Sequence, residues 1–240
     1  EGAATPGDLI MQRVSYMIAG IGARVFIGLA VFSLSACGVS NVVIQGSFPS
    51  PNIEPLPLSV VVYYDPALTE FAHIEYSETG TEEYNIAIGQ SQVEFFNSVL
   101  PAMFDEVVVV DSMEEAIARG GDAIFTPRIE EFQLALPSKT KLGVYEVWIK
   151  YNMRLETGEG VPKADWVQTS YGKTPIESLR SVERSINDAA VAGLRDLASS
   201  FSLNFGKGTE AELWLKEIIE RPDPGSDGER TYRSRGFSSN

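Results

Sequence analysis

The clearest structural pattern in this 240-residue chain is VYEVWIKYNMRLE, residues 144–156. Apolar and polar side chains alternate along it, the apolar set being Tyr145, Val147, Ile149, Tyr151, Met153 and Leu155. Successive side chains of a β-strand point to opposite faces of the sheet, so this period of two predicts a strand with one buried and one solvated face. From Glu146 to Glu156, Trp148 is the single apolar side chain on the polar face.

Other strands and helices are expected on both sides of this stretch. β-branched and aromatic residues predict strands at residues 58–64, 71–76, 83–88, 107–110, 123–136 and 166–171. Apolar residues recurring every three or four positions predict helices at 90–104, 113–119 and 179–201, and a last one after Thr209. This order predicts an α/β (α+β) fold, a two-layer sandwich with a mostly antiparallel sheet and helices packed on one face.

The N-terminal region ends in LSAC, residues 34–37, and Cys37 is the only cysteine of the chain. It follows an apolar run at residues 25–36, and Arg13 and Arg24 are the basic residues before it. A run of about 12 residues suits the apolar core of a secretory signal better than a membrane span of about 20. The pattern resembles a bacterial lipobox, whose cysteine carries a diacylglycerol after cleavage.

We therefore expect residues 1–36 to be a signal peptide and Cys37 to be the lipidated residue. The part before Met11 or Met17 is interpreted as an upstream read-through. Two alternatives stay open: an uncleaved membrane anchor over residues 17–36, and a buried thiol without a role.

Composition divides the rest of the chain into three parts. Residues 37–57 contain four prolines, and after Cys37 we expect an extended tether, which at about 3.1 Å per residue spans up to roughly 60 Å. Residues 58–220 are expected to form a single α/β periplasmic domain, and residues 221–240 a disordered tail. Gly38, rather than an aspartate, follows Cys37. By resemblance to enterobacterial sorting, this favours the periplasmic face of the outer membrane.

Charge and residue content limit the classes of function. The formal net charge of −14 repels nucleic acid, so no nucleic-acid partner is expected. His73 is the single histidine, which excludes a two-histidine metal site and makes a Ser-His-Asp triad a weak hypothesis. The carboxylate pairs Glu114–Glu115 and Glu130–Glu131 are interpreted as solvated faces; only a pair converging in a cleft would suit a cell-wall hydrolase. We expect no catalytic residue, cofactor or metal, and no enzyme activity.

Two tryptophans are candidates for contact with a partner. Trp148 projects from the polar face of its strand, and Trp166 lies in the strand expected to pair with it. Exposed aromatic side chains on a sheet face are typical of binding surfaces. The alternative, that both tryptophans pack beneath helices, is the one we favour.

The chain resembles envelope lipoproteins of the YajG type, which include transport-auxiliary lipoproteins. The resemblance rests on the lipobox, the proline-rich segment, the strand pair at 122–136 and 145–155, and the Gly, Trp and Tyr residues that precede an Ala/Leu-rich helix. It implies a lipid anchor in the membrane and a role as adaptor or accessory subunit of an envelope assembly or transport machine. The alternative is a carrier of a lipid or small amphiphile, held between helices and sheet.

Overall fold

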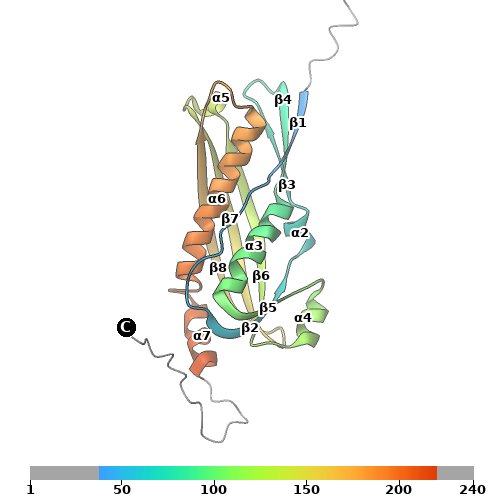
Figure 1. The fold of residues 1–240 in the computed structure, drawn as a ribbon. Coiled ribbons are helices and arrows are strands. Elements are labelled where there is room, and N and C mark those ends of the chain that lie inside the picture. Colours follow the sequence, from blue (N-terminus) through green and yellow to red (C-terminus); the bar gives the residue numbers. More distant parts are fainter. Residues whose placement is uncertain (1–37, 221–240) are drawn as a thin grey trace, which may run out of the picture.

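The computed structural model describes residues 38–220, which contain two β-sheets (Figure 1). The larger sheet has the strand order β5 (Phe104–Val110), β2 (Leu56–Tyr63), β6 (Ala123–Ala135), β7 (Val144–Thr157) and β8 (Pro162–Pro175). β2 is parallel to β5 and β6, whereas β6, β7 and β8 form an antiparallel meander. The alternating stretch at 144–156 is thus confirmed as a strand, and it lies between two long partners.

The smaller sheet has the order β1 (Gly38–Val43), β4 (Glu82–Ala87) and β3 (Ala72–Tyr76). β1 pairs with β4 in parallel, and β3 pairs with β4 in an antiparallel hairpin. Its inner face carries Val42, Tyr84 and Ile86, which are buried in the same hydrophobic core as the inner face of the larger sheet.

Two long helices, α3 (Gly89–Met103) and α6 (Val182–Asn204), lie over one face of the larger sheet beside the smaller sheet (Figure 1). Phe96 of α3 lies at the centre of the aromatic core, with ring centroids 6.1 Å from Phe125, 6.0 Å from Tyr151 and 6.0 Å from Phe201. This packing of helices on a sheet confirms the predicted α/β sandwich.

Shorter helices complete the domain: α2 (Pro66–Thr69), α4 (Met113–Arg119), α5 (Pro137–Thr140) and α7 (Glu210–Glu220). Among the described residues, α4 departs from the predicted one-sided arrangement. Its Ala116 packs with Val61, Val110 and Ile124, which point away from the main core. Because strand side chains alternate between faces, α4 covers the opposite face of β5, β2 and β6.

Capping residues define where two of these helices begin. Ser112 Oγ accepts a hydrogen bond from Glu115 N at the start of α4, as expected for an N-cap. Ser181 Oγ accepts from Arg184 N at the start of α6. The predicted start of the long helix at Leu179 is therefore wrong, and Leu179 lies fully exposed in the preceding turn.

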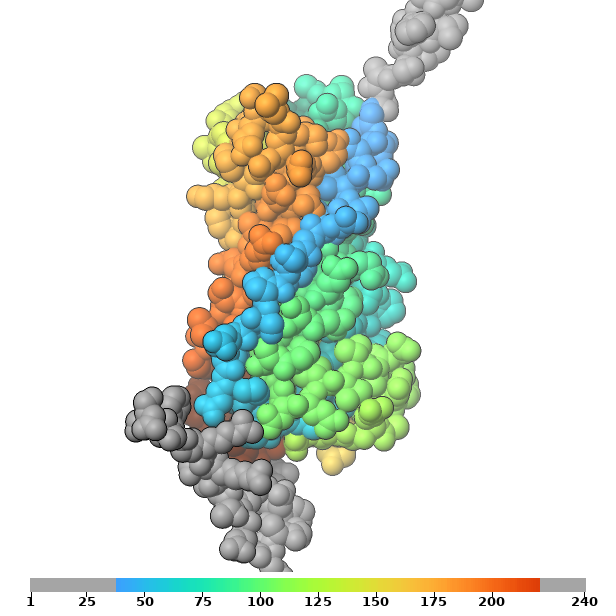
Figure 2. All heavy atoms as spheres, viewed as in Figure 1, coloured from blue at the N-terminus to red at the C-terminus, as the bar shows by residue number. Residues whose placement is uncertain are grey.

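The prediction of a free tether after Cys37 is also wrong for residues 38–57. This N-terminal segment crosses the domain between α3 and α6 (Figure 2). Val42, Ile44 and Phe48 are buried along it, and the Phe48 ring meets the Phe95 ring edge to face at 5.8 Å. The proline content suggested an extended chain, and it is extended, but its apolar residues fill a groove that only the folded helices create.

Hydrogen bonds fix the N-terminal segment to both helices. From α3, Ser98 Oγ donates to Phe48 O at 2.6 Å, and Ser91 Oγ donates to Ile44 O. From α6, Asn187 Oδ1 accepts from Gln45 N at 2.8 Å, and the Arg195 guanidinium donates twice to Ser47 O at 3.1 and 3.2 Å. The folded domain therefore includes β1 and the rest of the N-terminal segment, from Gly38 onward.

Some predictions concern parts of the chain outside the described residues. The signal peptide at 1–36, lipidated Cys37 and the tail at 221–240 lie there. Within residues 38–220, none of the helices combines the length and the apolar character that a membrane crossing requires.

Candidate partner-binding surface

The outer face of the β6–β7–β8 meander carries the residue that sequence analysis singled out. Trp148 of β7 lies opposite Gln133 of β6 and Tyr171 of β8 in the strand register. Its side chain is 39% exposed, and its ring centroid lies 5.1 Å from that of Tyr171. Trp148 therefore forms an aromatic pair on a sheet face that, among residues 38–220, is left partly open at this point.

Charged and polar residues surround this aromatic pair. The Tyr171 hydroxyl donates to Glu146 Oε1 at 2.6 Å, and this hydrogen bond raises the pKa of Tyr171. Lys150 Nζ lies 2.7 Å from Glu130 Oε2, and that hydrogen bond raises the pKa of Lys150. The ion pair and the hydrogen bond hold polar side chains around the rings and leave the rings accessible.

A shallow groove of about 270 Å³ borders Trp148. Its lining residues come from three adjacent strands: Glu131, Gln133, Trp148, Ile149, Lys150, Thr169 and Ser170. The groove is smaller than the roughly 300–1,000 Å³ of typical small-molecule sites. Its size and open shape suit one side chain of a partner protein better than an enclosed ligand.

Trp166 does not share this surface. It lies opposite Met153 in the register, on the inner face of β8, and is only 8% exposed. Its ring meets Phe205 edge to face at 5.3 Å, and Nε1 is buried without a hydrogen-bond partner. The suggestion that Trp166 contacts a partner is wrong, because the β7–β8 register places Tyr171, not Trp166, beside Trp148. The favoured alternative, in which both tryptophans pack inside the protein, is therefore confirmed for Trp166 but not for Trp148.

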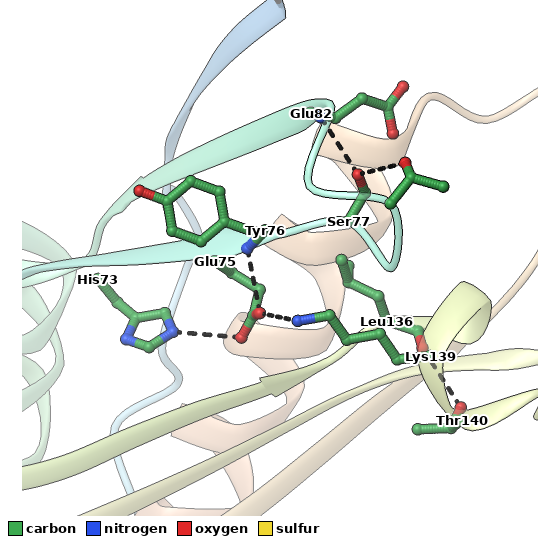
Figure 3. Close-up of polar contacts among 9 residues, drawn as sticks. His73, Glu75, Tyr76, Ser77, Glu82, Leu136, Lys139 and Thr140 are labelled. Carbon is green, nitrogen blue, oxygen red and sulfur yellow. Dashed lines mark hydrogen bonds and ion pairs between the residues drawn. The ribbon is translucent and has the colours of Figure 1, made fainter.

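The single histidine, His73, contacts an aromatic ring and a carboxylate of the fold. His73 of β3 packs its ring against Phe132 at 5.1 Å, and its Nε2 lies 3.5 Å from Glu75 Oε2 (Figure 3). Burial raises the pKa of Glu75, but hydrogen bonds from Lys139 Nζ and Tyr76 N outweigh it and hold the pKa below its usual value. His73 thus belongs to a group of polar contacts that joins β3 to α5.

The two carboxylate pairs considered for hydrolysis take part in separate local contacts. Glu115 lies in the first turn of α4, and its Oε2 accepts from Asp111 N at 3.3 Å. Glu130 forms the ion pair with Lys150, and Glu131 Oε1 accepts from Gln133 Nε2 at 2.5 Å. These contacts match the interpretation of both pairs as surface carboxylates.

Sequence analysis did not single out the buried carboxylate Glu156. It is 6% exposed on the outer face of β7, and its Oε2 has no hydrogen-bond partner. Burial raises its pKa, opposed by the charges of Arg154 and Arg128. Glu156 is one of the polar residues of the alternating stretch 144–156, so an exposed side chain was expected. No feature of the sequence indicates that this side chain is buried.

The space between helices and sheet, where the alternative role as a carrier would place its ligand, is occupied by aromatic side chains. Phe95, Phe96, Phe125, Tyr151 and Phe201 are all fully buried there. Their rings contact one another at centroid distances from 4.8 to 6.1 Å. This packing resembles a closed protein core rather than a binding cavity.

Comparison with known proteins gives similarity at the level of structure. No family model matches the chain, and no curated protein matches it. A DUF330-family protein from Xanthomonas campestris is 12% identical, with a TM-score of 0.41, over 68% of this chain and 92% of that one. A minor lipoprotein from Acinetobacter baumannii is 14% identical, with a TM-score of 0.35, over 66% and 96%. An uncharacterized lipoprotein from Nitrosomonas europaea is 13% identical, with a TM-score of 0.34, over 66% and 88%. Bacterial lipoproteins are therefore among the solved structures that this chain resembles.

Proposed function

We propose that this protein is a non-enzymatic lipoprotein of the bacterial envelope, anchored through Cys37, that binds a protein partner as an adaptor or accessory subunit. The LSAC sequence at residues 34–37 supports the anchor. Gly38, the residue after Cys37, already belongs to β1, so cleavage before Cys37 would remove none of the described residues.

The observation that carries the adaptor role is the exposed Trp148–Tyr171 pair. Tryptophan and tyrosine contribute most to binding where a partner excludes water from them. Here Trp148 lies on β7, which pairs with strands on both sides, and Tyr171 lies on the edge strand β8, so the register of β7 and β8 sets the positions of both rings before a partner arrives. Such preorganisation lowers the entropic cost of association.

Residue Gly38 after the cysteine supports placement at the periplasmic face of the outer membrane. A Cys37→Ser variant tests the anchor itself. We expect it to lose metabolic palmitate labelling and to leave the membrane fraction or remain unprocessed. Unchanged labelling would show that Cys37 is not the lipidated residue.

The adaptor role is tested by in-cell crosslinking and mass spectrometry of the lipidated protein and its Trp148→Ala variant. We expect the unaltered protein to recover envelope proteins in fixed stoichiometry and Trp148→Ala to recover several-fold less. Leu213→Ala is a matched control, because Leu213 is also exposed but lies on α7, away from the groove. Recovery of the protein with lipid alone would instead support the carrier.

A further inference from the structure

We propose that the end of the domain where Gly38 lies rests directly on the membrane surface, with Leu142, Ile176 and Leu179 inserted among the lipid headgroups. The occupant of this apolar surface is the bilayer that holds the acyl chains of Cys37. The inference rests on the proposed lipid anchor and adds to it a fixed orientation and a contact surface.

An anchor on Cys37 would lie directly beside the folded domain. Consecutive Cα atoms of a trans peptide lie about 3.8 Å apart, so Cys37 is that close to Gly38. Gly38 is already the first residue of β1 and pairs with Glu82 of β4. Because the N-terminal segment is fixed between α3 and α6, it cannot act as a spacer that separates the domain from the membrane. An acylated Cys37 therefore brings this end of the domain to the membrane.

Exposed apolar side chains lie at the same end. Leu179 is fully exposed, and Leu142 and Ile176 are each 54% exposed. Leu142 lies in the loop between α5 and β7, and Ile176 and Leu179 lie in the loop between β8 and α6. A hydrogen bond joins the two loops, since Ile176 N donates to Gly143 O at 3.0 Å. Figure 1 places α5, the start of α6 and the β3–β4 turn together at this end.

The smaller sheet adds two more exposed side chains to this surface. Val39 lies opposite Glu83, which in turn lies opposite Tyr76, so the three share one row and one face. Val39 is 59% exposed and Tyr76 48% exposed. Tyrosine is favoured where an apolar surface meets headgroups, because its ring and hydroxyl suit the two environments.

Side-chain contacts hold the connections of this surface in place. Glu75 of β3 binds Lys139 of α5, and Ser77 Oγ accepts from Glu82 N at 3.1 Å within the hairpin (Figure 3). Arg180 contacts Asp188 at 3.0 Å, which ties the turn that carries Leu179 to α6. The apolar side chains are thus presented by a structured end of the domain.

Charge does not explain attraction of this end to a membrane. The basic residues of the two loops at this end, Lys139, Lys141 and Arg180, are each paired with a carboxylate of the same end or of α6. We therefore expect apolar contact to dominate, with little dependence on anionic lipid. Leucines are also exposed at the far end, on α7 and the end of α6, so it is the position of Gly38 that decides which end faces the membrane.

The test uses the single cysteine of the chain. An acylated Cys37 has no free thiol, so a cysteine introduced elsewhere in the lipidated protein is the one reactive site. Variants L179C and L142C are labelled with an environment-sensitive fluorophore and reconstituted in phosphatidylcholine vesicles containing headgroup-level spin-labelled lipid. L213C is the matched control, since Leu213 is an exposed leucine at the far end.

We expect several-fold stronger quenching at positions 179 and 142 than at 213, unchanged when anionic phosphatidylglycerol is included. Equal quenching at all three positions, or the strongest quenching at 213, would overturn the proposed orientation while the anchor stands. Labelling of a second thiol in each variant, with no sedimentation with vesicles, would instead show that Cys37 is not acylated and that the proposed anchor fails.

Discussion

Gly172 of β8 and Gly193 of α6 face each other where the helix and strand backbones come into direct contact. A Cβ atom at Gly172 would lie 2.1 Å from Ala189 O and 2.2 Å from Gly193 N. Both distances are far below van der Waals contact, so only glycine fits at this position of the strand. Beside this contact, Asp196 Oδ2 of α6 accepts from Tyr171 N at 3.3 Å, so α6 also satisfies part of the free edge of β8.

Alanine substitutions at these two glycines should differ in their effect on stability. We expect Gly172→Ala to lower the free energy of unfolding by at least about 3 kcal/mol, because two rigid backbones must separate. Gly193→Ala should leave it unchanged or raise it by about 0.5–1 kcal/mol, because its Cβ would meet its nearest atom at 3.4 Å and alanine favours the helix. Urea unfolding measures both, and equal destabilisation would contradict this packing.

A double-mutant cycle tests whether the N-terminal segment is bound to α6. A Cβ at Gly46 would lie 2.7 and 2.8 Å from the two methyl carbons of Val191. We expect Gly46→Ala to destabilise the domain by about 1–3 kcal/mol and to expose residues 38–57 to limited proteolysis. Gly46→Ala combined with Val191→Ala should cost less than the sum of the single changes. A free tether would make Gly46→Ala neutral.

The two tryptophans of the meander should differ in their contribution to stability. Trp166→Ala removes a ring packed between Phe125 and Phe205, so we expect a loss of about 3–5 kcal/mol. Trp148→Ala removes a partly exposed ring whose aromatic partner is Tyr171 and should cost about 1 kcal/mol or less. Far-ultraviolet circular dichroism during urea unfolding gives both values without relying on tryptophan fluorescence. A large loss for Trp148→Ala would mean that this residue is structural.

The Glu75–Lys139 contact predicts a pH-dependent part of stability. The pKa of Glu75 in the folded protein is lower than in the unfolded chain, where it is about 4.3. Its stabilisation is therefore complete above that value and is lost as the pH falls through the folded pKa. Glu75→Gln should cost roughly 0.5–1 kcal/mol near neutral pH, and the difference should close in acid.

Glu78→Gln is the control for this measurement. Glu78 pairs with Lys141, but both side chains are more than half exposed. We expect a change near zero at every pH, since such surface pairs contribute little. A difference between Glu75→Gln and the unaltered protein that persists at low pH would show that the side chain acts through packing instead of charge.

Local patterns in the sequence predicted much of this fold. The alternation from Tyr145 to Leu155 follows from the geometry of a strand with one wet face, and β7 spans it. The short helix at 113–119 was predicted, and the structure caps it with Ser112, one of the two polar residues, Asp111 and Ser112, that precede it and can cap a helix. Proline lacks the N–H that a strand ladder needs, which predicts that Pro127 lies at an edge or a bulge of its strand. It lies beyond the Ala123–Phe125 stretch that pairs with β2, where β6 has no ladder partner on that side.

Features that depend on distant residues could not be predicted in this way. Val42, Ile44 and Phe48 are buried in a groove between α3 and α6, which are separated from each other by more than 75 residues. Trp166 faces the core because the register set by the β7–β8 turn brings Tyr171 beside Trp148. Of the proposed surface, sequence analysis therefore identified Trp148 but neither its aromatic neighbour nor the groove.

The parallel pairing of β1 with β4 has a mechanical consequence for an anchored protein. Tension on Cys37 would act along β1, from its first residue and in line with the strand. The hydrogen bonds between Gly38–Val43 and β4 would then be loaded together in shear and would not open one after another. Beyond them, Asn187 and Arg195 hold the next residues of the same segment. A domain built in this way can transmit force between a membrane and a bound partner without unravelling from its attached end.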